Sequence, residues 1–218
     1  MKTFFKKAEY VLLTLFVVFL SQVPFIYEKL IISGKGFSAR TTIVDAFICL
    51  LIVFYSLRMA KKEGLLSLDF SFFNWGAVGK LAISYFLSLP LGIIVLAVKR
   101  VEGAPKVTSN QAALEELFKH MPMLLILFGV ILVAPVLEEI VFRGLIPQKL
   151  FPKHQILGMA IGTVLFGLFH SPHNLSSFIF YAGMGAILAW VAYSSKRLEM
   201  SILAHALRNG VTFLLYWL

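Results

Sequence analysis

The sequence is poor in charge and nearly free of cysteine. Only 14% of its 218 residues are charged, whereas 59% are hydrophobic and the mean hydropathy is +0.87. Because soluble domains are about 45–50% apolar, this composition argues against an ordinary soluble protein and indicates a membrane protein. The single cysteine, Cys49, cannot form an intramolecular disulfide or a CxxC metal pair.

Familiar motifs are also missing. The sequence contains no HExxH zinc-protease helix, no GxSxG nucleophile elbow, no internal repeat and no low-complexity tract. The net charge of +9 comes from short basic clusters between apolar runs, so no nucleic-acid partner is expected. Residues 1–27 resemble a signal peptide but lack an A-x-A-like cleavage site, and we expect them to form an uncleaved first span.

The apolar runs are long enough to be transmembrane helices. About 20 helical residues cross a hydrocarbon layer of about 30 Å, and such runs occur near 9–27, 41–59, 79–98, 121–142, 155–170, 175–195 and 200–217. The two sizeable connections, 61–76 and 99–120, are too short for a soluble domain. We therefore predict an all-α polytopic integral membrane bundle of about seven transmembrane helices. It forms a single domain over residues 1–218, with a motif-bearing core at about 121–218.

The basic residues predict the orientation. If the N-terminus is cytoplasmic, the cytoplasmic connections carry more Lys and Arg than the outer ones, as the positive-inside rule requires. We expect a multi-pass protein of the cell membrane, surrounded by lipid, with its N-terminus in the cytoplasm.

Two glutamates and an arginine lie in the fourth span, in the stretch VLEEIVFRG. A charge at membrane depth costs about 2.5–3.5 kcal/mol and is a functional candidate by default. Residues four apart on a helix face each other, so Glu139 and Arg143 form the natural ion pair. Glu138 points about 100° away, lacks a local cation and is free to act as a base. The structural alternative is that both carboxylates extend toward the interface beside Arg143.

Other polar residues lie in the later spans. His205 and Asn209 are four apart and share a helix face, where they can position a water, stabilise an oxyanion or join helices by hydrogen bonds. His170 ends the fifth span and is either a site residue or a satisfied structural histidine. At 1.5 Å per residue, Glu138 lies roughly 16 Å, His170 roughly 25 Å, and His205 and Asn209 roughly 12 and 18 Å from the cytoplasmic ends of their spans. A helix tilt of about 20° absorbs this spread, so one polar cluster is geometrically feasible.

Two further features have structural interpretations. Asp45 stands alone near the end of the second span, from which its carboxylate can reach the interface. Gly158 and Gly162 form a GxxxG pattern that favours close helix packing.

This combination of residues suits water activation for hydrolysis. Glu138 can act directly as the base, or a metal can be held by Glu138, His170 and His205 with an open fourth position. The residues leave both routes open.

The motifs resemble those of the CAAX prenyl endopeptidase type, also called the CPBP or Abi family of intramembrane proteases. Its three motifs, EExxxR, FxxxH and HxxxN/D, stand here in the family order as Glu138 to Arg143, Phe166 to His170 and His205 to Asn209. The resemblance covers roughly the last 85 residues.

The resemblance implies a peptidase and a role for each motif residue. Glu138 would be the base, Glu139 and Arg143 would hold the site, and His170 would be catalytic or a ligand. His205 and Asn209 would stabilise the oxyanion.

The family is described both as metal-dependent, with zinc or another divalent metal, and as glutamate-dependent. Expected substrates are membrane-associated or lipidated peptides or proteins, and expected roles are bacteriocin self-immunity or peptide processing. The alternative is a non-catalytic membrane immunity or interaction protein that uses the same residues as structural contacts.

Overall fold

The computed structural model describes residues 2–69 and 71–217, with side chains for 5–69 and 71–215, and confirms the all-α fold. The described residues contain helices and connections without a strand. The α-helices are α1 (Lys2–Ser33), α2 (Ala39–Lys62), α3 (Trp75–Glu102), α4 (Ser109–Phe118), α5 (Met123–Leu127), α6 (Ala134–Glu139), α7 (Gln155–Phe169), α8 (Leu175–Ser195) and α9 (Leu198–Trp217). Two π-helical segments, η1 (Phe128–Val133) and η2 (Ile140–Leu150), make α5 to η2 one continuous helix.

Each predicted span overlaps one helix or one continuous helical stretch of the bundle. Among the described residues, five helical stretches are long and apolar enough to cross a membrane: Phe5–Ser33, Ala39–Lys62, Trp75–Glu102, Met123–Leu150 and Leu175–Ser195. Helix α7 is apolar but shorter, and α9 is not among the five. The protein is therefore a polytopic helical membrane bundle, as predicted, although length and hydropathy identify five spans where about seven were expected.

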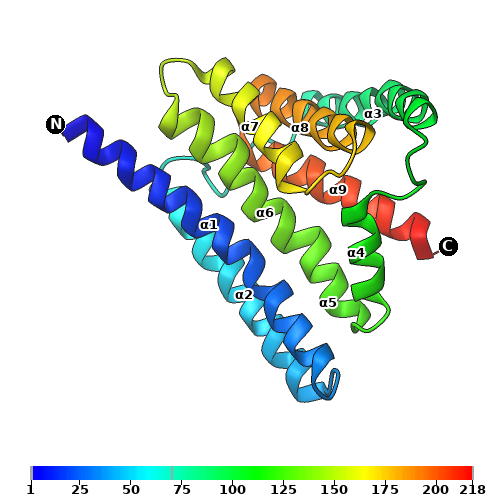
Figure 1. Ribbon diagram of the computed structural model, residues 1–218. Helices are drawn as coiled ribbons and strands as arrows, with labels where there is room; N and C mark the ends of the chain where they lie inside the picture. The colour runs from blue at the N-terminus through cyan, green and yellow to red at the C-terminus, as the bar shows by residue number, and fades with distance from the viewer. Residues whose placement is uncertain (1, 70, 218) are drawn as a thin grey trace.

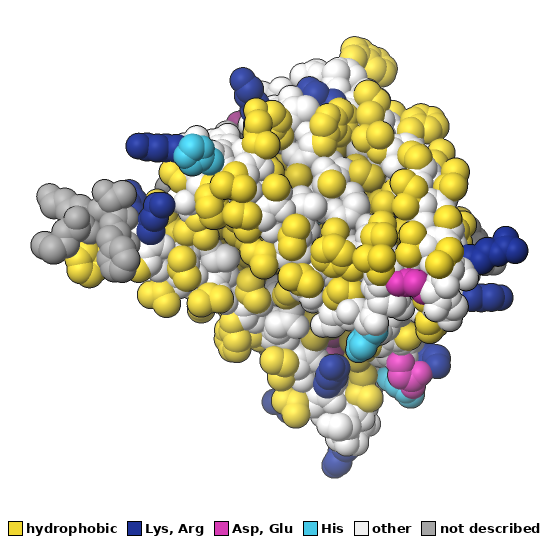
Figure 2. Space-filling view, turned by 45° about the horizontal axis from the view of Figure 1, so that its top comes forward, with side chains coloured by type: hydrophobic (Ala, Val, Ile, Leu, Met, Phe, Trp, Pro, Cys, Tyr) yellow, Lys and Arg dark blue, Asp and Glu magenta, His cyan; other side chains and the backbone are white. Residues whose placement is uncertain are grey.

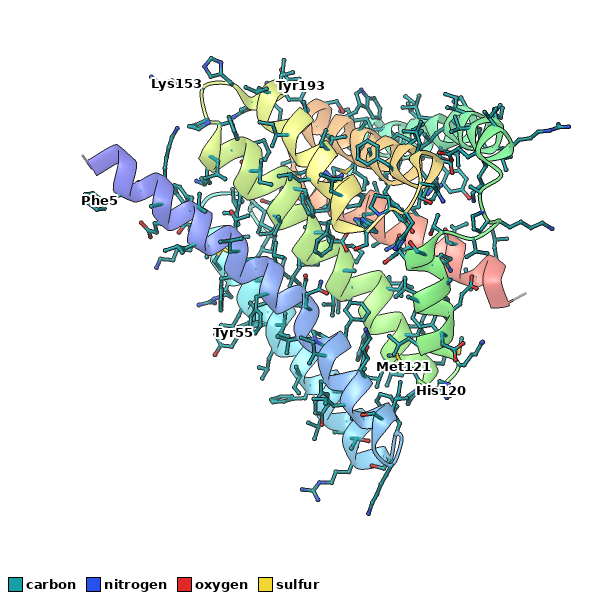
Figure 3. All side chains as sticks on the ribbon, viewed as in Figure 1. Phe5, Tyr55, His120, Met121, Lys153 and Tyr193 are labelled. Atoms are coloured by element: carbon teal, nitrogen blue, oxygen red, sulfur yellow. The ribbon has the colours of Figure 1, made fainter. Side chains whose placement is uncertain are left out.

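The central helix, residues 123–150, is enclosed by the others (Figure 1). The antiparallel pair α1 and α2 packs along one side, and α7 and α9 pack against the other, with α8 and then α3 further out. In Figure 3, His120 and Met121 mark one end of this helix and Lys153 marks the other. In its most apolar stretch 61% of the residues are buried, against 6% in α3. Polar side chains on the central helix consequently face protein, not lipid.

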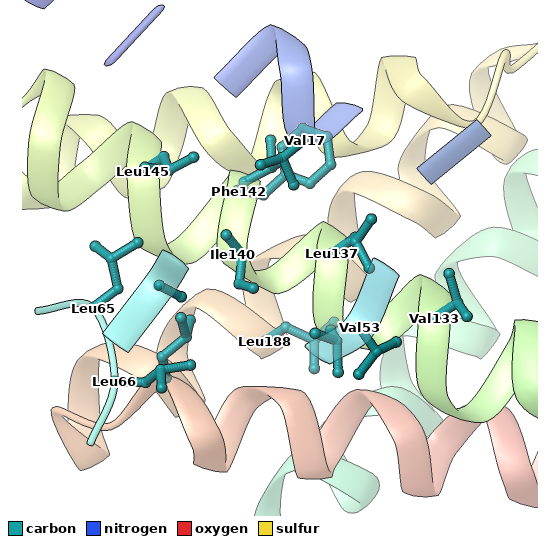
Figure 4. Packing of buried hydrophobic residues seen from close by; sticks show 14 of the residues in the cluster. Val17, Val53, Leu65, Leu66, Val133, Leu137, Ile140, Phe142, Leu145 and Leu188 are labelled. Atoms are coloured by element: carbon teal, nitrogen blue, oxygen red, sulfur yellow. The ribbon is translucent and has the colours of Figure 1, made fainter. Parts of the chain in front are cut away.

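The core is built on this central helix (Figure 4). Leu137, Ile140 and Leu145 are fully buried, and Val17 of α1 and Leu188 of α8 pack against them. By contrast, the outer surface in Figure 2 shows hydrophobic side chains over most of the face, with basic and acidic side chains around its edges. An apolar outside around a polar-containing centre is the pattern expected of a bundle in lipid.

The fourth span is longer than predicted because it continues through a proline. Pro147 has no N–H and so removes one backbone donor from the helix. The chain nevertheless continues in a π register to Leu150, and the side-chain amide of Gln148 donates to the Arg143 carbonyl at 3.2 Å. The central helix therefore extends beyond residue 142.

Three other expectations are resolved by the packing. The GxxxG prediction is confirmed, since a Cβ on Gly158 or Gly162 would collide with the backbone of the central helix. The connection 99–120 contains a short helix, α4, capped by the Thr108 hydroxyl, which accepts from the backbone N–H of Gln111 at 3.2 Å. The interpretation that Asp45 reaches the interface is wrong, because its side chain is fully buried between helices.

Candidate active site

Glu139 anchors a polar network at the middle of the bundle. Its carboxylate is fully buried and accepts a hydrogen bond from Arg143 Nη1 at 2.8 Å. Ser201 Oγ donates to the second oxygen at 2.5 Å, and His205 Nδ1 lies 2.9 Å from the first. The predicted i to i+4 pair is therefore present, and two residues of α9 complete the coordination of the carboxylate. A buried carboxylate with three hydrogen-bond partners is well compensated.

Arg143 links the central helix to its neighbours. Its Nη2 donates to the carbonyl of Gly185 on α8 at 2.9 Å, and its guanidinium lies 4.4 Å from the centre of the Phe166 ring on α7. Gly185 lacks a side chain where the guanidinium approaches, and a Cβ there would meet Arg143 Nη2 at 3.3 Å. The ion pair thus fixes α6, α7, α8 and α9 relative to one another.

His205 stands between the two glutamates. A carboxylate beside a guanidinium only accepts hydrogen bonds, so Nδ1 of His205 carries the proton that it shares with Glu139. In the neutral ring Nε2 then has a free lone pair. Nε2 lies 3.9 Å from Glu138 Oε2, beyond hydrogen-bond distance but close enough for both groups to act on one bound molecule.

Glu138 differs from its neighbour in having no hydrogen bond within the described part of the chain. Its Oε2 is buried without a partner among the described residues, and the residue as a whole is 9% exposed. The carboxylate faces a cavity of about 360 Å³, which is also lined by His170, His205 and Asn209. The expectation that Glu138 is left free by the Glu139 ion pair agrees with this geometry.

His170 lies at the C-terminal end of α7 and is held on two sides. Its Nδ1 is 2.8 Å from the Phe166 carbonyl, which directs Nε2 away from the helix. The Tyr181 ring of α8 stacks on the imidazole at 4.2 Å between centroids and 14° between planes. The Tyr181 hydroxyl in turn contacts Thr108 at 2.8 Å and Asn110 at 3.3 Å, at the start of α4. Helix α4 therefore forms one wall of the cavity and is tied to the histidine through Tyr181.

Asn209 has a structural contact in addition to its place on the cavity. In the π register of η1 the Ala134 N–H donates to the Gly129 carbonyl, so the next carbonyl, that of Val130, faces Pro135, which has no N–H. Asn209 Nδ2 donates to this carbonyl at 2.9 Å. The second amide hydrogen is still available to a molecule in the cavity.

Sequence reasoning missed three contributors. Ser201 could have been found, because it lies four residues before His205 on the same helix face. Phe166 belongs to the FxxxH motif, but the motif does not predict that its ring contacts Arg143, His170 and His205. Tyr181 has no sequence signal, since only the fold brings it onto His170.

The predicted metal-ligand set is not assembled as such. Among the described residues, no three His, Cys, Asp or Glu side chains form a group that could hold a metal ion. Glu138 and His205 are neighbours, but His170 does not join them as a third ligand at this geometry.

The polar cluster lies in the part of the chain that resembles a known protein family. Residues 120–211, which include all six predicted site residues, match the family described as type II CAAX prenyl endopeptidase Rce1-like. The chain is 32% identical over 123 residues to the membrane-embedded CAAX protease MroQ of Staphylococcus aureus, covering 54% of this chain and 49% of that protein.

Two longer matches are more distant. YdiL of Bacillus subtilis, whose description names a membrane peptidase, is 26% identical over 77% of this chain and 68% of its own length. The UPF0177 protein YajF of Lactococcus lactis is 26% identical over 85% of this chain and 92% of its own length. No solved structure matches the chain significantly.

Proposed function

The chain belongs to the CPBP family of CAAX protease-like membrane proteins, and on that premise we propose that it is an intramembrane endopeptidase. It hydrolyses a peptide bond in a membrane-associated or lipidated peptide or protein. We further propose that it resides in the cell membrane with its N-terminus in the cytoplasm, and that it acts in bacteriocin self-immunity or peptide processing.

One observation carries this proposal. Two adjacent glutamates on one buried helix have opposite environments. Among the described residues, Glu139 has three hydrogen-bond partners and Glu138 has none. The unpartnered carboxylate faces the cavity beside His205 Nε2. A buried carboxylate without a partner is costly to maintain and is the group expected to act as a general base.

The geometry supports a direct hydrolytic sequence. Glu138 takes a proton from water while the water oxygen bonds to the substrate carbonyl carbon. The second amide hydrogen of Asn209 donates to the resulting oxyanion, and Glu139 stabilises the cationic ring if His205 is protonated. Glu138 then gives its proton to the amine nitrogen as the C–N bond breaks, which restores the carboxylate.

The involvement of zinc or another divalent metal is open to direct measurement. Glu138 and His205 offer an oxygen and a lone-pair nitrogen on the cavity, and a metal bound there would polarise the carbonyl or activate water. Metal content of the purified protein and activity after chelation distinguish this route from the direct one.

A second candidate is a non-catalytic immunity or interaction protein. It is favoured by the network around Glu139, which joins η2, α8 and α9 as interhelical contacts would. On this account the motif residues maintain the fold, and their substitution lowers stability or partner binding without any turnover to lose.

Cleavage of a tethered peptide library in detergent separates the two candidates. The variants are Glu138→Ala, His170→Ala and His205→Ala, with exposed Glu9→Ala on α1 as the matched control. We expect each site variant to lose about 10²–10⁴-fold in rate and the control to keep full rate. Unchanged cleavage in all three site variants would contradict the proposal.

A further inference from the structure

Arg208 occupies an unusual position within the third motif. It lies on α9 between His205 and Asn209 and lines the same cavity as both. Three residues along a helix correspond to about 300° of rotation and about 4.5 Å of rise. The Arg208 side chain therefore starts from nearly the same side of α9 as His205, about one turn further along.

The guanidinium of Arg208 has no anionic partner among the described residues. Its recorded neighbour is the Tyr85 ring of α3, 6.0 Å away, next to a smaller cavity of about 60 Å³. Arg143 and Arg197, by contrast, are each paired with a carboxylate at 3.1 Å or less. Glu138, the free carboxylate on the same cavity, forms no ion pair with Arg208.

A partly buried and unpaired arginine inside a membrane bundle requires an explanation. Such charges are costly and face the interior when they serve a ligand. Among the described residues that line the cavity, the other Lys or Arg is the exposed Lys29 of α1. Much of the remaining lining is apolar, so an anion that entered would find Arg208 as the cation next to the reacting groups.

We propose that Arg208 binds a carboxylate of the peptide substrate and thereby selects where the chain is cut. A guanidinium binds carboxylate through two parallel hydrogen bonds, and low polarity strengthens the contact. The rise of about 4.5 Å from His205 to Arg208 along the helix is little more than the length of one extended residue, about 3.3–3.6 Å. With the reach of the arginine side chain, the carboxylate lies within a few residues of the scissile bond. The carboxylate belongs either to the chain end or to an acidic side chain.

This assignment rests on the proposed function for cleavage, but binding can be tested without turnover. The protein is used as the full chain in uncharged detergent, with Glu138→Gln to prevent hydrolysis. Three fluorescent peptides of one sequence are compared: a free C-terminal acid, the C-terminal amide, and the amide with Glu as last residue. Binding is also measured in Arg208→Gln, Arg208→Lys and Lys29→Gln backgrounds, and the thermal transition of each variant establishes that it is folded.

We expect a carboxylate-bearing peptide to bind about 10-fold or more tightly than the plain amide. The preference is lost in Arg208→Gln, reduced in Arg208→Lys and retained in Lys29→Gln. The free acid and the Glu amide identify which source of carboxylate is preferred. Equal binding of all three peptides, or a preference that survives Arg208→Gln or depends on Lys29, would overturn the assignment. Competition of phosphatidylglycerol with the peptide that depends on Arg208 would also overturn it, because the arginine would then bind a lipid phosphate.

The outcomes separate this inference from the proposed function. Arg208-dependent binding without any Glu138-dependent cleavage would support the carboxylate site and contradict the proposed peptidase activity. Glu138-dependent cleavage at equal rates for the free acid, the Glu amide and the plain amide would support the peptidase activity and contradict the carboxylate site.

Discussion

Two pairs of acidic residues are buried in this protein, and their surroundings differ. Glu28 of α1 and Asp45 of α2 are 1% and 0% exposed and close enough to interact, yet three of their four oxygens have no hydrogen-bond partner among the described residues. Glu138 and Glu139 are buried to a similar degree, but one has an arginine, a serine and a histidine around it and the other faces a cavity.

The difference shows that burial alone does not identify a functional carboxylate. Within the described part of the chain, the α1–α2 pair forms no ion pair with a cation, and neither residue lines the cavity beside Glu138. The motif pair differs because Glu139 is held by hydrogen-bond partners, whereas the carboxylate of Glu138 is accessible to a ligand in the cavity. A site can use a reactive carboxylate only when its neighbour keeps the helix in place.

Removing the arginine would make the motif pair resemble the α1–α2 pair. Arg143→Leu leaves Glu139 buried without a cation, and we expect a loss of about 3–5 kcal/mol in stability. Thermal unfolding in detergent measures this, with the exposed Arg58→Leu of α2 as control. An unchanged transition in Arg143→Leu would mean that the ion pair does not hold the site.

His170 is supported by an aromatic ring, and no described ring contact supports the α1–α2 pair in this way. Tyr181→Leu removes the ring stacked on His170, which is worth about 0.5–1.5 kcal/mol, and so we expect cleavage to slow by up to about tenfold. Tyr181→Phe keeps the ring and should retain most of the rate while releasing the hydroxyl contacts to α4. Equal rates in Tyr181→Leu and wild type would exclude a positioning role.

Neutralising the α1–α2 pair should have a smaller effect. Because no described cation pairs with Glu28 or Asp45, the double variant Glu28→Gln with Asp45→Asn should change stability by no more than about 1 kcal/mol or increase it. Cleavage should be unaffected. A large loss of activity would show that this pair, too, takes part in function.

The smallest effect is expected at the surface, where an exposed ion pair allows comparison with the buried one. The pKa of Asp69 is lowered from 3.8 to about 2, first by its hydrogen bonds with the Ser71 hydroxyl and then by Arg197. A lowered pKa stabilises the fold above the ordinary value, and this contribution disappears as the pH falls from about 4 through about 2. Asp69→Asn should therefore flatten the pH dependence of unfolding slightly in that interval. Identical profiles for variant and wild type would show that the pair contributes nothing.

The sequence was informative where charge is rare. In apolar spans the few ionisable residues stand out, and the four-residue spacing was sufficient to pair Glu139 with Arg143 and to leave Glu138 unpaired. The helix-length runs predicted the long helices for the same reason, because a membrane span has a required length.

The contacts between distant helices could not be predicted in this way. Tyr181 reaches His170 only because α7 and α8 pack together, and Glu28 meets Asp45 only because α1 and α2 are antiparallel. The central helix also continues past Pro147 in a π register, with the Gln148 side chain bonded to the Arg143 carbonyl. Sequence periodicity does not encode such contacts.

The central claim is that Glu138 acts as the catalytic base and that the adjacent Glu139 stabilises the folded site. The most direct test measures cleavage rate per folded molecule and thermal stability together for Glu138→Gln and Glu139→Gln. The account predicts that Glu138→Gln loses about 10²–10⁴-fold in rate with its unfolding transition preserved, whereas Glu139→Gln unfolds at lower temperature. Full activity in Glu138→Gln, or the reverse assignment of the two losses, would contradict it.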